Sequence, residues 1–393
     1  MNNTEKFLID VLRCFATDTK TKLNTDGVDK EELFALSKKQ SVTGIVSYIL
    51  ERYDIFSGDE IRAKFAREYD YTIMQMLSRE SSAQKLCDKF TEMGIPHIMF
   101  KGTTISEVYP VKVLRAYGDV DIIVHKEHIP AIREYMTGEG FEYSLTDEGV
   151  VSVFRRGREK YEIHTSLNEP IAKSSAFFSD LWSNAELQHG QTYSFNHNFH
   201  LCYLICHLEK HVYGSGSGVK MYLDIALYLR KYPDSIDMDY VRESLSSCGL
   251  GQFFETVLYM CNRWFGLELP SWVKPLEEEL YEQMCEFIFS GGVFGVQGKK
   301  DIMSDDLRRE MASGRKFAKF RFIMSRIFPS AHELCRMFPQ FQGKPLLIPC
   351  AWFCHVFKVI SKGKLSNVKA IIKTDAEQAQ DKKEFLDRIG SRR

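Results

Sequence analysis

The sequence has almost no net charge and no long uncharged apolar run. Its 393 residues include 52 lysines and arginines and 53 aspartates and glutamates, which gives a formal net charge of −1. No overall field therefore attracts nucleic acid or a membrane surface, and any polyanion must meet a local basic patch. The most apolar stretch, residues 345–357, contains a histidine and is too short for a membrane span, which needs roughly 18 uncharged residues.

A secretory signal is also missing, because the first residues, MNNTEKFLIDVLRCF, have no basic start followed by an apolar core. Ten cysteines are scattered along the chain. Without a secretory signal, this pattern is typical of reduced and mostly buried thiols. We therefore expect a cytoplasmic protein without a membrane span, whose oligomeric state the sequence does not indicate.

The hydrophobic pattern divides the chain into four segments. Apolar residues recur at helical spacing over residues 1–95, a strand-like pattern follows over 96–170, and helical spacing returns over 171–340. Residues 341–393 form an apolar segment and then a charged tail, for which we expect a solvated helix or a frayed end. The length is sufficient for two or three domains.

The second segment predicts a small mixed β-sheet. Short apolar or alternating runs predict strands at residues 97–100, 119–124, 141–145, 150–156 and 160–167. Helices are expected between them at 103–109 and 127–140. Strands that first alternate with helices and then follow one another indicate an α+β fold with helices on one face of the sheet. We expect N-terminal and C-terminal helical regions to flank this core.

Two aspartates lie in the second predicted strand. Asp119 and Asp121 are two residues apart, so their side chains leave the same face of a strand. Carboxylates held this close repel one another unless a cation joins them, and Mg²⁺ accepts such oxygens together with phosphate oxygens. The pair alone is a weak signal, because strand aspartates often lie on a solvated edge.

A glycine turn precedes this pair. Lys101, Gly102 and Thr103 directly follow the first predicted strand and begin a helix. Glycine lets the backbone approach a ligand closely, and a helix start presents free N–H groups to an anion. A Gly-Thr turn is common by itself. The order of a strand, this turn, a helix and a strand with two aspartates is a recurring unit.

A third acid, Glu162, lies in the last predicted strand of this segment. The alternation of residues 161–164 places Glu162 and His164 on one face. A carboxylate here could bind a metal and help to deprotonate an attacking hydroxyl. The competing interpretation is a strand glutamate paired with a surface lysine.

Together, these motifs resemble the nucleotidyltransferase superfamily with the DNA polymerase beta-like fold. The run FKGTTISEVYP, followed by LRAYGDVDIIV and YEIHTSL, is similar in particular to the bacterial uncharacterised nucleotidyltransferase family. Weaker similarity continues through HLEKHVYGSGSGVKMYLDIAL and into the later apolar segment, so the resemblance covers most of the chain. It implies Mg²⁺- or Mn²⁺-dependent transfer of a nucleoside monophosphate from an NTP to an acceptor hydroxyl, with release of pyrophosphate.

The resemblance also implies roles for individual residues. Asp119 and Asp121 would bind the metals and Glu162 would be the third acid. Gly102 and Thr103 would hold the triphosphate. Thr103 stands where many superfamily members have serine, and it keeps the hydroxyl.

Basic residues around these motifs are candidates for phosphate binding. Lys101 and Arg115 flank the glycine turn and the second strand, and Arg115 could instead pair with one of the aspartates. Lys220 and Asp224 are four residues apart at the start of a predicted helix, where a simple salt bridge is the favoured interpretation. In the alternative, Lys220 reaches the triphosphate and Asp224 orients it.

Three histidines are further candidates. His164 is followed by threonine where the narrower family often has tryptophan, which changes the contacts open to an acceptor or a base. His207 and His211 are four apart on a predicted helix, with Cys202 and Cys206 on a neighbouring face. Zinc would need another ligand, so we expect this helix to pack against the core with His211 near the nucleotide cleft.

The sequence leaves the acceptor open, whether a small molecule, a protein or an RNA. One rival to the enzyme is a non-catalytic nucleotide sensor on the same fold, which would bind NTP without turnover. Another is a toxin-type nucleotidyltransferase that modifies a protein or a tRNA, and a third is an aminoglycoside-like modifier of small molecules. The third acid favours an enzyme over the sensor, and the long, nearly neutral chain is unlike a compact basic toxin.

Overall fold

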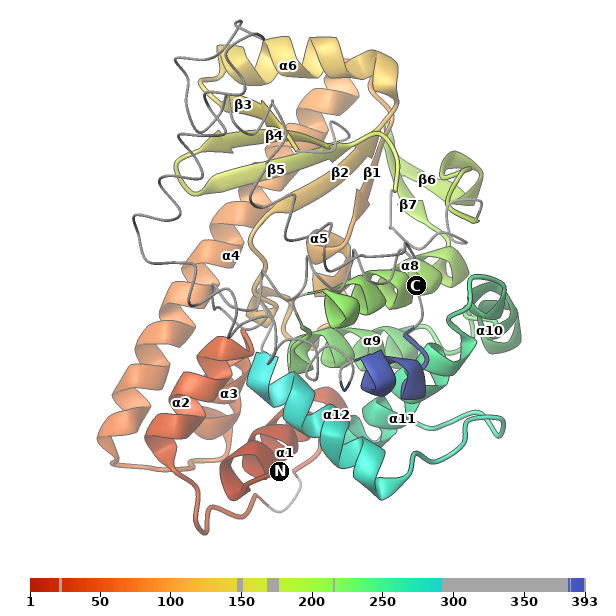
Figure 1. The fold of residues 1–393 in the computed structure, drawn as a ribbon. Helices are drawn as coiled ribbons and strands as arrows, with labels where there is room; N and C mark the ends of the chain where they lie inside the picture. Colours follow the sequence, from red (N-terminus) through yellow and green to blue (C-terminus); the bar gives the residue numbers. More distant parts are fainter. Residues whose placement is uncertain are drawn as a thin grey trace, which may run out of the picture. The chain divides into compact units, whose positions relative to one another are not determined.

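The structure of the chain is a computed structural model, which describes residues 1–20, 23–146, 151–167, 177–214, 216–291, 381 and 383–391 (Figure 1). Of these, the residues up to 291 and residues 389–391 belong to one compact unit, and residues 381 and 383–388 belong to a second. Residues 383–388 of the second unit are helical. The apolar segment predicted at 345–357 lies outside the described residues.

A seven-stranded sheet lies in the first unit. Its strands are β1 (His97–Phe100), β2 (Val120–Val124), β3 (Glu142–Leu145), β4 (Val151–Arg156), β5 (Glu159–His164), β6 (Ala185–His189) and β7 (Thr192–Phe195). They follow the order β3-β4-β5-β2-β1-β7-β6, with parallel pairs β2–β5 and β1–β7 and antiparallel pairs elsewhere. The mixed sheet with flanking helices confirms the predicted α+β fold.

The first five strands match the runs of alternating and β-branched residues in the sequence. The expected helices between them are present, although the first is only one turn long. Here the structure has α5 (Gly102–Ser106), the short 3₁₀ turns η1 (Lys112–Leu114) and η2 (Lys126–His128), and α6 (Ile129–Gly138). Gly140, at a φ of +82°, supplies the left-handed residue that lets the chain turn from α6 into β3.

Helices α4 (Glu60–Glu92) and α6 cover one face of the sheet, and Figure 1 shows α4 behind it. One buried cluster joins these helices to the sheet. The helices contribute Ala83, Leu86, Phe90, Ile132 and Met136, and the strands contribute Val120, Ile122, Val124, Phe154, Tyr161 and Ile163. Burying each larger side chain contributes about 1.5–3 kcal/mol. Because strand side chains alternate, burial of Val120 and Ile122 sends Asp121 to the opposite face.

The hairpin of β6 and β7 was missed by the sequence analysis, which expected only helices after residue 171. β7 pairs in parallel with β1 and β6 completes the edge of the sheet, so the sheet extends past residue 170. Gly190, at a φ of +55°, makes the turn between the two strands. The strands are short and β6 is largely exposed, so their apolar alternation is weak.

The N-terminal residues form helices, as predicted. They are α1 (Asn3–Thr17), α2 (Lys30–Lys39) and α3 (Thr43–Arg52), followed by the long α4. The side chains of Asn2, Asp29 and Asp59 accept hydrogen bonds from backbone N–H groups in the first turns of α1, α2 and α4. These caps satisfy donors that a helix start otherwise leaves without a partner.

Helices also follow the sheet. After β7 these are α8 (His197–Tyr213), α9 (Val219–Lys231), α10 (Met238–Ser247), α11 (Gly251–Phe265) and α12 (Glu278–Gly291). The 3₁₀ turn η3 (Trp182–Asn184) comes earlier and leads into β6. The N-terminal helices pack against them, because Arg13 of α1 donates to the backbone oxygens of Arg263 and Trp264 at the end of α11, at 2.7 and 2.8 Å. A cation at this end of a helix also meets the negative end of its dipole.

The last described residues are held in place, so the frayed end expected for the tail is wrong for residues 389–391. Ile389 and Ser391 are buried. The Ser391 hydroxyl donates to Glu209 of α8 at 2.8 Å, and the Thr256 hydroxyl of α11 donates to the Ile389 oxygen at 3.2 Å. These contacts attach the carboxyl-terminal residues to the helices of the first unit.

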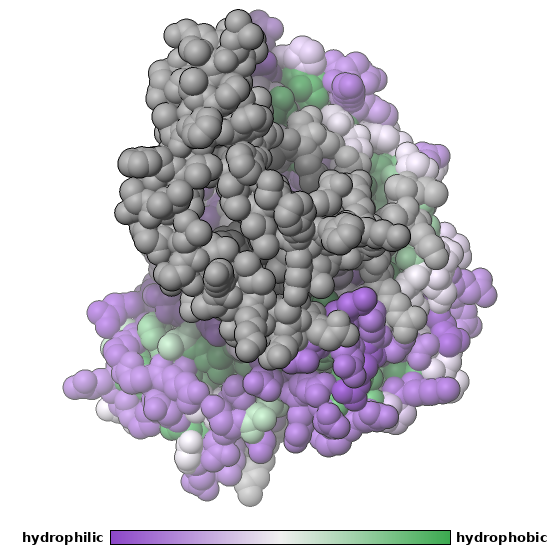
Figure 2. All heavy atoms as spheres, in the orientation of Figure 1, coloured by the Kyte–Doolittle hydropathy of each residue, from purple (hydrophilic) through white to green (hydrophobic). Residues whose placement is uncertain are grey.

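None of the helices in the described residues is both long enough and apolar enough to cross a membrane. Seven of the ten cysteines lie in the described residues, and all seven are buried thiols, as expected. In Figure 2, the coloured surface over the N-terminal helices and α12 is mostly hydrophilic, with single apolar residues scattered through it.

Candidate active site

Three carboxylates meet where β2 begins beside β5. The parallel register pairs Asp121 of β2 with Glu162 of β5, so both side chains leave the same face. Asp119 comes one residue before β2 rather than within it. His164 lies two residues after Glu162 and shares its face, as the alternation predicted.

Asp121 is buried, with only 3% of its surface exposed. Its Oδ1 atom accepts a hydrogen bond from Lys101 Nζ at 2.7 Å and lies 2.9 Å from His164 Nε2. Burial alone would raise the pKa of Asp121, but the charge of Lys101 and the contact with His164 outweigh it and hold that pKa well below its usual range. The carboxylate is therefore ionised at neutral pH.

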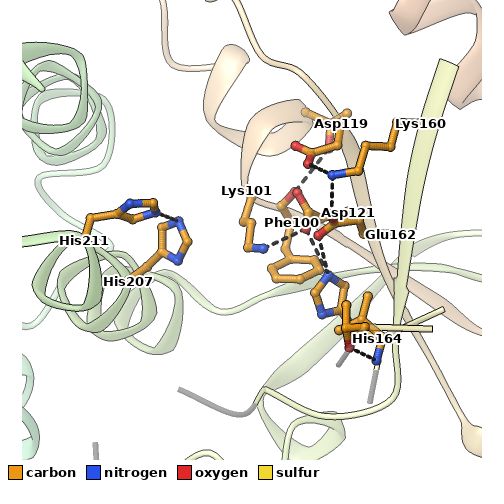
Figure 3. Close-up of polar contacts among 12 residues, drawn as sticks. Phe100, Lys101, Asp119, Asp121, Lys160, Glu162, His164, His207 and His211 are labelled. Carbon is orange, nitrogen blue, oxygen red and sulfur yellow. Dashed lines mark hydrogen bonds and ion pairs between the residues drawn. The ribbon is translucent and has the colours of Figure 1, made fainter. Parts of the chain in front are cut away.

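Lys160 joins the other two acids. Its ammonium group donates to Asp119 Oδ2 at 2.8 Å and also to Glu162 (Figure 3). Burial, the largest single effect, would lower the pKa of Lys160, but its hydrogen bonds with Asp119 and Glu162 and the charges of both carboxylates together outweigh burial and raise it. The competing interpretation of Glu162, a strand glutamate paired with a lysine, is thus correct as far as the pairing goes.

One group in the described residues has the ligand atoms to hold a metal ion. It consists of Asp121, Glu162 and His164, whose ligand atoms all lie within 4.8 Å of one another. The sequence had instead predicted a metal site made by Asp119, Asp121 and Glu162. Two carboxylate oxygens and an imidazole nitrogen suit Mn²⁺ and other first-row ions as well as Mg²⁺.

The turn between β1 and α5 is strained at a charged residue. Lys101 has a φ of +55° and a ψ of −122°, a conformation that L-residues rarely adopt. Gly102 follows, and a Cβ there would lie 2.9 Å from the Tyr117 ring, so only glycine fits. The Thr103 hydroxyl donates to the Phe100 oxygen at 3.3 Å. The turn thus aims the Lys101 side chain at Asp121 at the cost of backbone strain.

Arg115 and Asp224 form a buried ion pair. Arg115 donates to both oxygens of Asp224, at 2.9 and 2.8 Å, and to the Gly102 oxygen at 3.0 Å. The Tyr109 hydroxyl also donates to Asp224, at 2.6 Å. Burial and the negative charge of Asp224 raise the pKa of Tyr109 well above its usual value. This network connects the glycine turn to α9.

Lys220 does not form the favoured salt bridge with Asp224, so that prediction was wrong. Asp224 pairs with Arg115, and Lys220 Nζ donates to the Ala116 oxygen at 2.6 Å. Burial and the nearby charge of Arg115 lower the pKa of Lys220 to about 8, although Asp224 and Asp119 act in the other direction.

A cavity of about 400 Å³ opens beside these groups. Acidic and basic side chains from five different segments line it, namely Arg79, Lys101, Arg115, Asp119, Asp121, Lys220 and Asp224, together with Gly102 of the turn. Thr103 and Glu162 are not among the lining residues. Many of its polar groups are cationic, which suits a polyanionic ligand beside a metal site.

Two histidines line the cavity from α8. His207 Nε2 and His211 Nε2 lie 3.2 Å apart, and Figure 3 shows the two rings on the helix facing Lys101. His211 lines this cavity, and its place near a nucleotide cleft stays a prediction. Within the described ranges, no group of three possible metal ligands includes either histidine, which gives no support to zinc.

Sequence reasoning missed Arg79, Tyr117 and Lys160. Arg79 comes from α4, lines the cavity and donates to the backbone oxygen of Tyr117. No local motif marks a basic residue in the middle of a long helix. Lys160 could have been found, because a Lys-x-Glu alternation in a strand places both side chains on one face.

Comparison with known proteins identifies the family. A family model described as "Uncharacterised nucleotidyltransferase" matches residues 26–266, more than half of the chain. The match includes the sheet, the glycine turn, the acids and the helices that carry Lys220 and the two histidines. No curated protein and no solved structure matches the chain. The chain therefore belongs to this nucleotidyltransferase family.

Proposed function

We propose that the chain transfers a nucleoside monophosphate from an NTP to an acceptor hydroxyl and releases pyrophosphate, in a metal-dependent reaction of the DNA polymerase beta-like type. The observation that carries this proposal is the pairing of Asp121 with Glu162 on adjacent parallel strands, beside a cavity that four lysine and arginine side chains help to line. The family to which the chain belongs supports the same class of reaction and an NTP substrate.

The residues fit a divalent cation. Asp121 and Glu162, with His164, offer three ligand atoms within 4.8 Å, and Asp119 stands beside them for a second contact. In this proposal Asp119, Asp121 and Glu162 bind the metal, either Mg²⁺ or Mn²⁺. When bound, such an ion lowers the pKa of a hydroxyl and neutralises phosphate charge.

The cavity side chains bind and orient the triphosphate. Lys101 and Lys220 supply point charges, and Gly102, which lines the cavity, offers its backbone to the triphosphate. Thr103 shapes the turn through its hydrogen bond to Phe100. Arg115 is already paired with Asp224, so it acts by fixing the Gly102 carbonyl and hence the turn.

The reaction forms one bond and breaks one. The acceptor oxygen bonds to the α-phosphorus while the bond from that phosphorus to the bridging oxygen of the β-phosphate breaks, and pyrophosphate leaves. The hydroxyl proton passes to a base in the site. Glu162 lies on the sheet face that also carries Asp121 and His164, and its side chain is 21% exposed, which leaves it within reach of a hydroxyl that enters from solvent.

The proposal is tested with purified protein, Mg²⁺ or Mn²⁺, and each of the four NTPs labelled at the α-phosphate. The protein is incubated with cell lysate separated into RNA, protein and small-molecule fractions, and the fraction that acquires label identifies the acceptor class. We expect label in one fraction with wild type and none with Asp121→Asn. Undiminished transfer by the variant would contradict the assignment, and tight NTP binding without transfer to any fraction would indicate the nucleotide sensor.

A further inference from the structure

Lys160 places a positive charge among the acids that we propose as metal ligands. It lies on β5 two residues before Glu162, so both side chains point to the same face of the sheet. Its ammonium group bonds to Asp119 Oδ2 at 2.8 Å and to Glu162, and thereby bridges two of the three acids (Figure 3). The third acid, Asp121, is neutralised separately by Lys101 at 2.7 Å.

The ion pairs that Lys160 makes are partly exposed to solvent, so they can break. Side-chain exposure is 27% for Lys160, 35% for Asp119 and 21% for Glu162, against 4% for Asp121. A partly exposed ion pair is worth little because water can solvate both charges when they separate. The four-carbon side chain of lysine is flexible, so its ammonium can leave without movement of the strand.

An ammonium and a divalent cation bind to the same oxygen lone pairs. Glu162 belongs both to the Lys160 bridge and to the group with Asp121 and His164 that can hold a metal. A carboxylate whose oxygen accepts a hydrogen bond from an ammonium offers less negative charge to a metal ion. Lys160 bonds to Glu162 Oε1 and His164 Nε2 lies 3.8 Å from Oε2, so the two cations compete for the negative charge of one carboxylate. At Asp119, a metal ion that takes Oδ2 must displace Lys160.

We propose that Lys160 is a tethered counter-ion that must leave Asp119 and Glu162 when a divalent cation binds, so that the site takes up free metal poorly and a metal–nucleotide complex well. This inference rests on the proposed function. A metal–nucleotide complex supplies the cation that displaces the ammonium and also the phosphate oxygens that receive it. Free metal supplies only the first, and it leaves a displaced ammonium beside the new positive charge.

The Lys160 bridge also holds the site together before a ligand binds. When Lys160 is bound, the two carboxylates are held together without mutual repulsion, and the site stays assembled before the ligand arrives. Removal of the ammonium should then have opposite effects on two properties. Metal affinity should increase, because the competitor is gone, and metal-free stability should decrease, because Asp119 and Glu162 repel each other.

The experiment measures binding of Mn²⁺ alone to the full chain, by electron paramagnetic resonance of free Mn²⁺ and by calorimetry. The variant Lys160→Met keeps the aliphatic stem and removes the charge. We expect it to bind Mn²⁺ at least tenfold more tightly than wild type, which corresponds to about 1.4 kcal/mol. Lys160→Arg, which keeps a cation, should bind as weakly as wild type. In EDTA, Lys160→Met should melt below wild type, and Mn²⁺ should raise its melting temperature further.

Lys112→Met is a matched control. Lys112 also bridges two carboxylates, those of Glu80 and Glu107, with 37% side-chain exposure, and it is outside the metal group. This control should leave Mn²⁺ binding unchanged. Equal affinity in wild type and Lys160→Met would overturn the inference, as would weaker binding in the variant, because Lys160 would then position the carboxylates for the metal.

Failure of the inference is distinguishable from failure of the proposed function. If wild type binds Mn²⁺, Asp121→Asn does not, and Lys160→Met equals wild type, the metal site stands and the role of Lys160 is refuted. If neither wild type nor Lys160→Met binds Mn²⁺ more tightly than Asp121→Asn, both are refuted. If Lys160→Met does not fold, Lys160→Arg decides: tenfold tighter Mn²⁺ binding in that variant would refute competition by charge, and wild-type-like binding would support it.

Discussion

Two clusters of acidic and basic side chains reach the same cavity, the first through Asp119 and the second through Arg115 and Asp224, and they hold their charges differently. In the first, Lys160 bridges Asp119 and Glu162 with about a third to a fifth of each side chain exposed. In the second, Arg115 and Asp224 form a two-pronged pair in which each side chain is 9% exposed.

The difference separates a site that can exchange partners from a support that cannot. Water and ligands can replace the contacts of a partly exposed ion pair, whereas a buried pair has no such substitute and breaking it leaves a charge without solvation. The first cluster is therefore suited to bind a metal ion and to react. The second keeps the glycine turn fixed against α9 while that happens.

The largest effect should come from removing the ligand charge of Asp121, which lies beside Glu162 of the first cluster. Asp121→Asn keeps the volume and one acceptor oxygen but removes a ligand charge. We expect nucleotidyl transfer to fall on the order of 10⁴-fold, as when an essential carboxylate is removed from other active sites. The melting temperature should fall only modestly, because Lys101 loses its charged partner but keeps 20% exposure and can be solvated. Initial rates and a thermal melt check this, and a large loss of stability with an unchanged rate would reverse the comparison.

Asp224→Ala should have the opposite signature. It leaves the Arg115 guanidinium buried without its counter-ion, which costs about 3–5 kcal/mol. We expect a marked fall in the urea midpoint of unfolding. Asp119→Ala, in the first cluster, is the control and should shift that midpoint much less. Equal losses of stability in the two variants would show that the clusters do not differ as described.

The strained turn gives a third test. Lys101→Ala and Lys101→Gly both remove the ammonium beside Asp121, and both should weaken nucleotide binding. They should differ in stability, because glycine adopts a φ of +55° without penalty while alanine keeps a strain of about 1–3 kcal/mol. Chemical denaturation measures the difference. If Lys101→Gly is no more stable than Lys101→Ala, the turn is unstrained.

The smallest effect should be a pH dependence of nucleotide affinity. Lys220 has a pKa lowered to about 8 by burial and Arg115, so it is charged below that pH and neutral above it. A bound phosphate favours the charged form, so affinity should be greatest below pH 8 and fall with rising pH. We expect about a tenfold loss per pH unit at most.

The control for this dependence is Lys220→Arg, which stays charged throughout the range. Affinity for a non-hydrolysable NTP analogue should then show no fall between pH 7 and 10. A fall of the same size in wild type and Lys220→Arg would assign the titration to another group.

The sequence predicted the local part of this architecture well. β1 to β5 and α6 follow from alternation and turn residues, and the shared face of Glu162 and His164 follows from strand geometry alone. The glycine turn, the three acids and His164 also lie within one stretch of the chain, residues 101–164. These features depend on neighbours in the chain, which a pattern can report.

The parts that were missed depend on distant partners. β7 pairs with β1, and short half-exposed strands carry little signal without the strand that they join. The Asp224 carboxylate pairs with Arg115 across 109 residues, although Lys220, one turn away on the helix, was the simpler partner. Arg79 reaches the cavity only because α4 passes beside Tyr117.

The central claim is most directly tested by one reaction with two labels. Wild-type protein, Mg²⁺ and the acceptor fraction are incubated with an NTP that carries one label at the α-phosphate and another at the γ-phosphate. The account predicts that the acceptor retains the α-label and that the γ-label leaves as pyrophosphate. Retention of the γ-label by the acceptor, or loss of a single phosphate from the NTP, would contradict it.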